Sequence, residues 1–390
     1  MQNFIFYNPV CVHFGKGQIA ALTSEIPTQF KVLMTYGGGS IKKNGVYDQV
    51  MEALKSHTIV EFPGIEPNPT YETCMKAVEI IRKEGIDYIL SVGGGSVLDG
   101  SKFMAAAAKH QGEDPWDIVL GKEPVQEAVP LGCVLTLPAT GSEMNGNSVI
   151  SRSSTGQKRA FGSSRVMPQF SILDPETTFS LPKRQVANGV ADAYTHVLEQ
   201  YLTYDVNTPL QDRWSEGVLL TLIEEGRKTL DDMQDYEARA NFMWAATMAL
   251  NGILAAGVVQ DWATHMIGHE LTALYGIDHA RTLAIVMPSL MEVAKDNKRK
   301  KLLQYGSRVF GITEKDGDED QRVLSAIEKT RQFYESLEIP TRFSAYKDLD
   351  IKPDTPQIVA KRLSDQGLTA LGEKGDITPE KVEEILALCA

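Results

Sequence analysis

The chain contains an aspartate and three histidines whose types and spacing are those of a metal-binding site: Asp192, His196, His265 and His279. Asp192 and His196 lie four residues apart in a stretch with helical periodicity, which places a carboxylate and an imidazole on one face of a helix. A second helical stretch repeats this spacing with His265 and His269, and His279 follows. One carboxylate with imidazoles suits zinc or iron better than calcium or magnesium, which prefer shells of oxygen. A hydrogen bond in a partly buried position would explain any one of these histidines as well, but the combination favours a divalent metal ion.

Glycine-rich turns could hold a phosphate group. The tetrapeptide GGGS occurs at Gly37–Ser40 and again at Gly93–Ser96, each time after a strand-like run. Glycine lets the main chain approach a diphosphate, and free N–H groups at the start of a following helix bind it. Neither copy matches the GxGxxG or the Walker pattern, and each could be only a tight turn.

Hydroxyl and amide side chains gather after a further strand-like run. Thr136, Thr140, Ser142 and Asn145 lie within the segment TLPATGSEMN. In an open α/β sheet, ligands bind beyond the carboxyl ends of the strands. Three such segments together predict a nucleotide-binding site.

The secondary structure expected around these residues changes along the chain, from alternating strands and helices to helices alone. The first half alternates strand-like runs with amphipathic stretches, which is the pattern of a parallel α/β sheet. The rest is nearly all helical, and we place the boundary at Pro182, which suits a helix start. The sequence thus predicts an α/β dinucleotide-binding domain with a Rossmann-like parallel sheet at 1–181, and an all-α metal-binding domain at 182–390. The expected strands are FIFYN (4–8), VLMTY (32–36), TIVEF (58–62), YILSV (88–92) and CVLTL (133–137).

Composition limits the class of protein. At 390 residues the chain exceeds the usual size of a single hydrophobic core, and 43% apolar residues can fill two. The net charge of −12 disfavours nucleic acid and anionic membranes as partners. Apolar runs are too short to span a membrane and the first residues do not resemble a signal peptide, so we expect a cytoplasmic protein. The four cysteines form no CxxC pair, and we expect all of them to be reduced and structural.

These motifs together resemble the iron-containing, or group III, alcohol dehydrogenases. The resemblance covers the whole chain, and TYGGGSIKK is similar to the NADPH-dependent aldehyde reductase and butanol dehydrogenase branch. It implies a dehydroquinate synthase-like architecture. The motifs that carry it are Gly93–Ser96 with Asp99 and Lys102, the turn Pro67–Pro69, TLPATGSEMN, Asp174 with Pro175, and the Asp, His, His, His set.

The resemblance also implies roles for individual residues. It assigns the metal ligands to Asp192, His196, His265 and His279. It leaves His269 unliganded beside the nicotinamide, where the imidazole could be the catalytic proton relay or could only pack against the cofactor. Spacing alone would have made His265 and His269 joint ligands. The residues expected to contact the cofactor are Gly37, Gly38, Gly39, Ser40, Lys43, Gly94, Gly95, Ser96, Asp99, Thr136, Thr140, Asn147 and Lys158.

We expect a metal-dependent, NADP(H)-linked alcohol dehydrogenase or aldehyde reductase that acts on short- to medium-chain primary alcohols or aldehydes of the butanol and butanal type. NADP(H) should be preferred over NAD(H), because the loop at Gly37–Ser40 has no acid for the ribose 2′-hydroxyl, whereas Lys42 or Lys43 could bind a 2′-phosphate. The ion is Zn²⁺ or Fe²⁺, and the family suggests a homodimer. Glycerol dehydrogenase and sugar-phosphate cyclase share the expected fold and remain alternatives, as does a nucleotide-binding sensor with a structural metal.

Overall fold

The computed structural model describes all residues, 1–390, and the chain folds into two compact units. The α/β unit contains Tyr7–Pro182 and Gln234–Thr247. The helical unit contains Met1–Phe6, Lys183–Met233 and Met248–Ala390. The division after Pro182 lies next to the boundary expected from the sequence. Two segments cross that boundary, however: Met1–Phe6 belongs to the helical unit, and Gln234–Thr247 belongs to the α/β unit.

A six-stranded parallel sheet forms the centre of the α/β unit, which confirms the predicted fold class. The strand order is β1-β8-β5-β4-β2-β3. An antiparallel hairpin of β6 and β7 stands apart from this sheet. The strands are β1 (Cys11–Phe14), β2 (Lys31–Tyr36), β3 (Thr58–Phe62), β4 (Tyr88–Gly94), β5 (Leu131–Leu137), β6 (Asn147–Arg152), β7 (Gln157–Gly162) and β8 (Phe170–Leu173).

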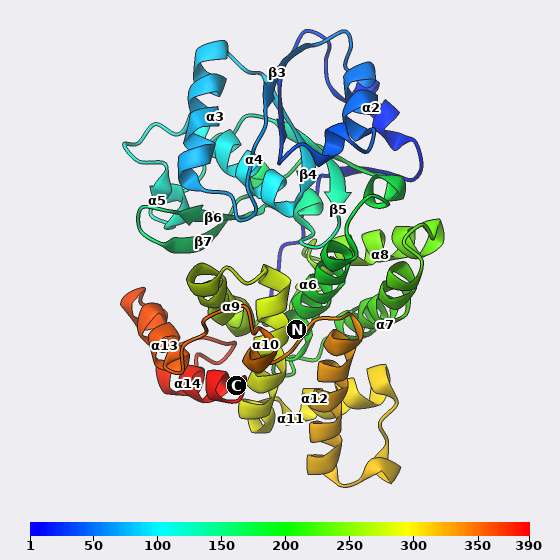
Figure 1. Cartoon of the computed structure of the whole chain (residues 1–390), viewed down its shortest axis with the longest axis vertical. Helices are drawn as coiled ribbons and strands as arrows, with labels where there is room; N and C mark the ends of the chain where they lie inside the picture. The colour runs from blue at the N-terminus through cyan, green and yellow to red at the C-terminus, as the bar shows by residue number, and fades with distance from the viewer. The chain divides into compact units, whose positions relative to one another are not determined.

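Helices cover both faces of this sheet (Figure 1). Successive side chains of a strand point to opposite faces, so in β4 Ile89 packs with α3 and α4, whereas Leu90 packs with α2. Because both faces are buried, the central strands β4 and β5 are mostly apolar along their length rather than alternating. The helices of this unit are α1 (Leu22–Glu25), α2 (Val46–Ala53), α3 (Tyr71–Glu84), α4 (Gly95–Lys109), α5 (Trp116–Val119) and most of α8 (Tyr236–Ala249).

The predicted strand at residues 4–8 is wrong. This apolar run has the composition of a strand, but no neighbouring strand pairs with it, and Ile5 is 96% exposed. The sheet begins instead at Cys11, which is paired with Phe170 of β8. The other four predicted strands correspond to β2, β3, β4 and β5.

One hydrophobic cluster of the helical unit is formed mainly by α9, α10, α13 and α14. Proline precedes or begins several helices of this unit, as at Pro182 before α6 and Pro209 in α7, where a missing N–H costs nothing. The long helices are α6 (Lys183–Tyr201), α7 (Pro209–Asp231), α9 (Ala263–Tyr275), α10 (His279–Val293), α11 (Lys295–Phe310), α12 (Glu319–Ser336), α13 (Thr355–Asp365) and α14 (Pro379–Ala387).

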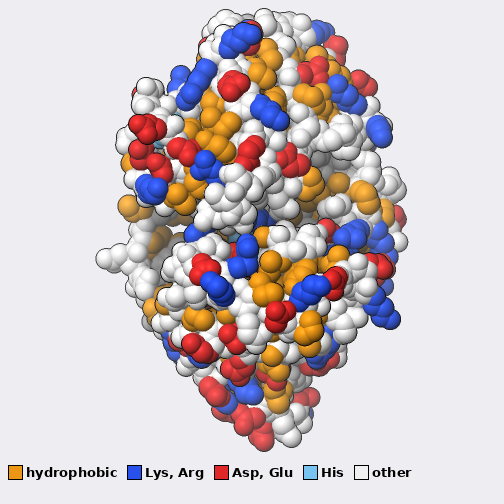
Figure 2. All heavy atoms as spheres, turned by 60° about the vertical axis from the view of Figure 1, so that its left-hand side comes forward, with side chains coloured by type: hydrophobic (Ala, Val, Ile, Leu, Met, Phe, Trp, Pro, Cys, Tyr) orange, Lys and Arg blue, Asp and Glu red, His pale blue; other side chains and the backbone are white.

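The surface carries charges of both signs. Figure 2 shows acidic and basic side chains intermingled on one face, without a continuous basic area there. None of the helices combines the length and the apolar character that crossing a membrane requires.

Candidate functional site

Helix α6 carries two of the predicted metal ligands, Asp192 and His196. Every residue from Val186 to Tyr201 is buried, as in a helix packed on all sides. The Oδ1 atom of Asp192 and the Nε2 atom of His196 are 3.8 Å apart. One face of a core helix therefore presents a buried carboxylate and a buried imidazole.

Helices α9 and α10 bring two more imidazoles next to this face of α6. His265 lies in the first turn of α9, and His279 is the first residue of α10. Asp192, His265 and His279 each offer a ligand atom, and these atoms lie within 4.8 Å of one another. His196 lies outside this group of three, but its ring stacks on that of His265 with 4.8 Å between the ring centroids.

The surroundings of Asp192 fit a bound cation. Its Oδ1 atom is buried and accepts no hydrogen bond, although the Nε2 atoms of His279 and His196 lie 3.6 and 3.8 Å away. A buried carboxylate oxygen without donors is costly unless a positive charge compensates it. Zinc and iron both accept carboxylate and neutral imidazole, so the donor set suits either ion.

Glu199 is a residue of this site that the sequence interpretation missed. One of its carboxylate oxygens pairs with Nδ1 of His265, and the other accepts a hydrogen bond of 2.6 Å from the main-chain N–H of Thr264. A carboxylate at Nδ1 orients the ring and leaves Nε2 as the ligand atom. Burial raises the pKa of Glu199 to about 8, and the nearby carboxylate of Asp261 acts in the same direction. The sequence contained a signal, because Glu199 follows Asp192 by two helical turns on one face of α6.

A buried ion pair fixes the start of helix α9. The Lys298 ammonium donates to Asp261 at 2.6 Å, and the other oxygen of Asp261 accepts from the N–H of Ala263 at 2.8 Å. Between them, Trp262 has φ 66°. Such a left-handed conformation costs a residue other than glycine about 1–3 kcal/mol and persists only where its surroundings impose it. The ion pair therefore holds the turn from which His265 projects.

His269, the predicted catalytic residue, lies one turn after His265 and is buried. Its ring centroid is 5.1 Å from that of His279 and 6.3 Å from that of His265. It is not among the three residues whose ligand atoms converge. The structure thus places His269 beside the candidate metal centre but outside that group.

In the α/β unit, a glycine turn joins β4 directly to α4. A Cβ atom on Gly93 would lie 2.6 Å from Val97, and one on Gly95 would lie 2.6 Å from Thr140, so larger residues would force the turn open. No side chain caps the start of α4. Its first N–H groups therefore suit the diphosphate predicted to bind at Gly94, Gly95 and Ser96.

The other glycine turn and the threonine-rich segment lie at the same edge of the sheet. Strands β2, β4 and β5 are parallel neighbours, so the segments that follow them begin at one edge. Gly37–Ser40 follows β2, and Thr136 and Thr140 lie at and beyond the end of β5. This is the edge at which an open α/β sheet binds a nucleotide.

Asp99 and Lys102 connect α4 by hydrogen bonds to the segment that follows β5. Asp99 accepts from the hydroxyl of Ser142 at 2.7 Å and from the N–H of Val149 at 2.9 Å. Lys102 donates to Ser142 and to the carbonyl of Asn147, both at 2.8 Å, and burial lowers the pKa of Lys102 to about 8. Asp99, predicted to contact the cofactor, therefore holds protein groups in place. A direct contact between Asp99 and the cofactor stays a prediction.

The remaining predicted cofactor residues lie on the hairpin. Asn147 is the exposed first residue of β6, and Lys158 lies on β7. The Lys158 ammonium donates to Asn68 at 2.8 Å. Asn68, in the PNP turn before α3, has φ 57°. Lys158 thus contacts this strained turn, and the main-chain N–H of Asn68 in turn donates to the hydroxyl of Ser96 at 3.4 Å.

The loop after β2 has an acidic neighbour that the sequence interpretation missed. Glu61 of β3 accepts from the Tyr36 hydroxyl at 2.6 Å and pairs with Lys42 at 3.2 Å. The hydrogen bond from Tyr36, with further contributions that include Lys42, lowers the pKa of Glu61. Lys42 and Lys43 are both exposed, but Lys42 is paired with Glu61. A Cβ atom on Gly38 would meet nothing within 4 Å, so the loop surface is open to a ligand.

Comparisons with known proteins agree with this arrangement. Residues 9–175 match the profile of iron-containing alcohol dehydrogenase, and residues 186–389 match the C-terminal part of the Fe-containing alcohol dehydrogenase family. The chain is 54% identical to the NADPH-dependent aldehyde reductase YqhD of Escherichia coli over 97% of each chain. It is 44% identical to a probable NADH-dependent butanol dehydrogenase 1 of Bacillus subtilis, over 91% of this chain and 92% of the relative. The crystal structure of Escherichia coli YqhD is similar with a TM-score of 0.97 and 52% identity, covering 100% of this chain and 99% of that one.

The parallel sheet, the buried Asp and His set and these matches together define an oxidoreductase that interconverts alcohols and aldehydes. The chain belongs to the iron-containing alcohol dehydrogenase family, which confirms the resemblance seen in the sequence.

Proposed function

We propose that this chain reduces short- to medium-chain aldehydes to primary alcohols with NADPH and one divalent ion, Zn²⁺ or Fe²⁺. The observation that carries this proposal is the convergence of Asp192, His265 and His279 in a protein of this family. The name of the Escherichia coli relative, an NADPH-dependent aldehyde reductase, supports the direction and the cofactor.

We assign two roles to the residues of the site, namely binding the metal ion and transferring a proton. When bound, the nicotinamide supplies the hydride and the metal ion withdraws electron density from the carbonyl oxygen of the substrate. We assign Asp192, His196, His265 and His279 to holding the ion, with Glu199 orienting His265. The product oxygen needs a proton. His269 is suited to relay it, because its ring adjoins this centre and an imidazole can accept a proton at one ring nitrogen and donate one from the other.

The central test is an absorbance assay of NADPH oxidation with butanal. We expect steady turnover by metal-loaded protein, loss of turnover after chelation, and recovery when Zn²⁺ or Fe²⁺ is added back. A nucleotide-binding sensor with a closed structural site would bind NADPH without any change that depends on butanal. That result would overturn the proposed function.

We expect NADPH to be preferred over NADH by roughly tenfold to a hundredfold in kcat/KM, because a charge-assisted contact to a phosphate contributes about 1.5–3 kcal/mol. We assign this contact to Lys43, since Lys42 is paired with Glu61. Lys43→Ala should remove much of the preference, and Gly38→Asp should reverse part of it by repelling the 2′-phosphate.

The measurement is kcat/KM for each cofactor with one aldehyde. Lys55→Ala is the matched control, because Lys55 is an exposed lysine paired with Glu52 on the same unit. Equal use of both cofactors by the parent, or full NADPH use by Gly38→Asp, would contradict the assignment.

A homodimer is also part of this proposal. The run from Phe4 to Tyr7 consists of apolar and aromatic side chains, all exposed, with Tyr7 64% exposed. Single exposed apolar residues are ordinary, but a contiguous run of this kind marks an interaction surface. Covering the run with a second copy of the chain would remove this apolar surface from water.

A further inference from the structure

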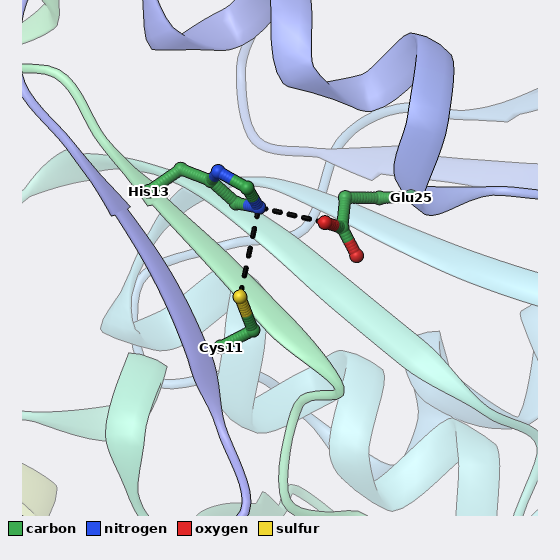
Figure 3. A group of neighbouring side chains, drawn as sticks. All are labelled: Cys11, His13 and Glu25. Carbon is green, nitrogen blue, oxygen red and sulfur yellow. Dashed lines mark hydrogen bonds and ion pairs between the residues drawn. The ribbon is translucent and has the colours of Figure 1, made fainter.

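A second group of metal-binding side chains lies on the α/β unit (Figure 3). Cys11 and His13 are two residues apart on β1, so their side chains lie on the same face of that strand. Glu25 reaches them from α1. The thiol sulfur lies 3.7 Å from Nε2 of His13, and the same nitrogen lies 2.7 Å from a carboxylate oxygen of Glu25. The three ligand atoms are all within 4.8 Å of one another.

The geometry distinguishes an ion site from a nucleophile and base. A catalytic cysteine needs a histidine that contacts the thiol with one ring nitrogen and an orienting acid with the other. Here the sulfur and the carboxylate both face Nε2 of His13, as Figure 3 shows. Three donors that converge on one point are the arrangement of a metal shell.

We propose that Cys11, His13 and Glu25 form a second divalent metal site, selective for borderline-soft ions such as Zn²⁺ or Co²⁺. Zinc bonds of about 2.3 Å to sulfur and 2.0 Å to nitrogen place these two atoms about 3.5 Å apart in a tetrahedron, close to the observed 3.7 Å. His13 and Glu25 need only separate slightly as the ion takes the place of the hydrogen bond between them, with the neutral imidazole of His13 carrying its proton on Nδ1 and any further proton released to solvent. Binding converts the thiol to a thiolate and releases its proton to solvent.

The site is open and separate from the candidate catalytic centre. Cys11 is exposed, in contrast to the expectation that all four cysteines are structural, and the other three are buried. The side chains of His13 and Glu25 are 24% and 26% exposed. Three protein ligands leave a fourth position for water, so the ion should exchange readily. Because the ligands join edge strand β1 to α1, binding should also stabilise that edge.

Cobalt titration tests the site by a signature that the catalytic centre cannot give. The full-length protein is first saturated with Zn²⁺ at its tightest site and then titrated with Co²⁺. A cysteine ligand gives a thiolate-to-cobalt charge-transfer band in the near ultraviolet, whereas the Asp and His set contains no sulfur. We expect this band to saturate at one further ion per chain.

Variants assign the band to its ligands. Cys11→Ser should abolish it, and His13→Ala and Glu25→Gln should each weaken Co²⁺ binding by roughly tenfold or more. Glu52→Gln, which replaces an exposed acid of α2, should leave the band unchanged. The proposal is overturned if no band forms at saturating Co²⁺, if Cys11→Ser retains it, or if His13→Ala and Glu25→Gln bind as tightly as the parent.

Discussion

His265→Ala is expected to leave the protein without its catalytic metal ion and to reduce NADPH oxidation with butanal to the background rate. The ligand atom of His265 converges with those of Asp192 and His279, and its ring is oriented by Glu199. Removing a ligand leaves a hole in the shell, and metal sites lose affinity steeply when that happens. Metal analysis of the purified variant together with the absorbance assay measures both effects.

Two further variants should have smaller effects on metal binding than His265→Ala. His269→Ala is the matched control, since it removes an imidazole of the same helix, and it should keep the metal while slowing turnover roughly a hundredfold or more and altering the pH profile. Glu199→Gln should weaken metal binding by roughly tenfold to a hundredfold, because it disturbs only the orientation of His265. If His269→Ala lost its metal as fully as His265→Ala, the assignment of ligand and relay would be wrong.

The predictions that succeeded rest on short-range patterns. The buried strands β2 to β5 are apolar runs separated by helical stretches, and this local pattern is sufficient to indicate a parallel sheet. Likewise, Asp192 and His196 are one helical turn apart, so the sequence alone places them on one face. The family resemblance, rather than spacing, selected His279 over His269 as a ligand. The ligand atoms of His279 and Asp192 do converge, but the assignment of the ligands stays a prediction.

The residues that were missed are joined by long-range contacts. Glu61 meets Lys42 only because β3 pairs with β2, so the loop sequence alone could not show the acid beside it. Residues 4–8 have strand composition, but strand formation depends on a partner that the sequence does not identify. Lys298 lies in a run of charged residues, a pattern typical of a solvated helix face, yet it is buried because helix α11 presents it to Asp261.

This buried lysine gives the largest expected change in stability. In the structure Lys298 is 4% exposed and donates to Asp261 and to Glu373 at 2.6 and 2.9 Å. Lys298→Met would leave two buried carboxylates without their cation. Removing one partner of a buried ion pair typically costs about 3–5 kcal/mol, so the urea midpoint of the helical unit should fall markedly.

The matched control is Lys300→Met, because Lys300 lies on the same helix and pairs with Asp205 at the surface. An exposed pair contributes at most about 1 kcal/mol, so this variant should unfold almost as the parent does. Unfolding is compared in metal-free protein, since a bound ion would add its own stabilisation to each variant. Adding Glu373→Gln to Lys298→Met should recover part of the loss, because burial already raises the pKa of Glu373 to about 6 and a neutral side chain there lacks the uncompensated charge. If Lys298→Met unfolded like Lys300→Met, the cluster would not fix the start of α9, and the position of His265 would have to depend on Glu199 alone.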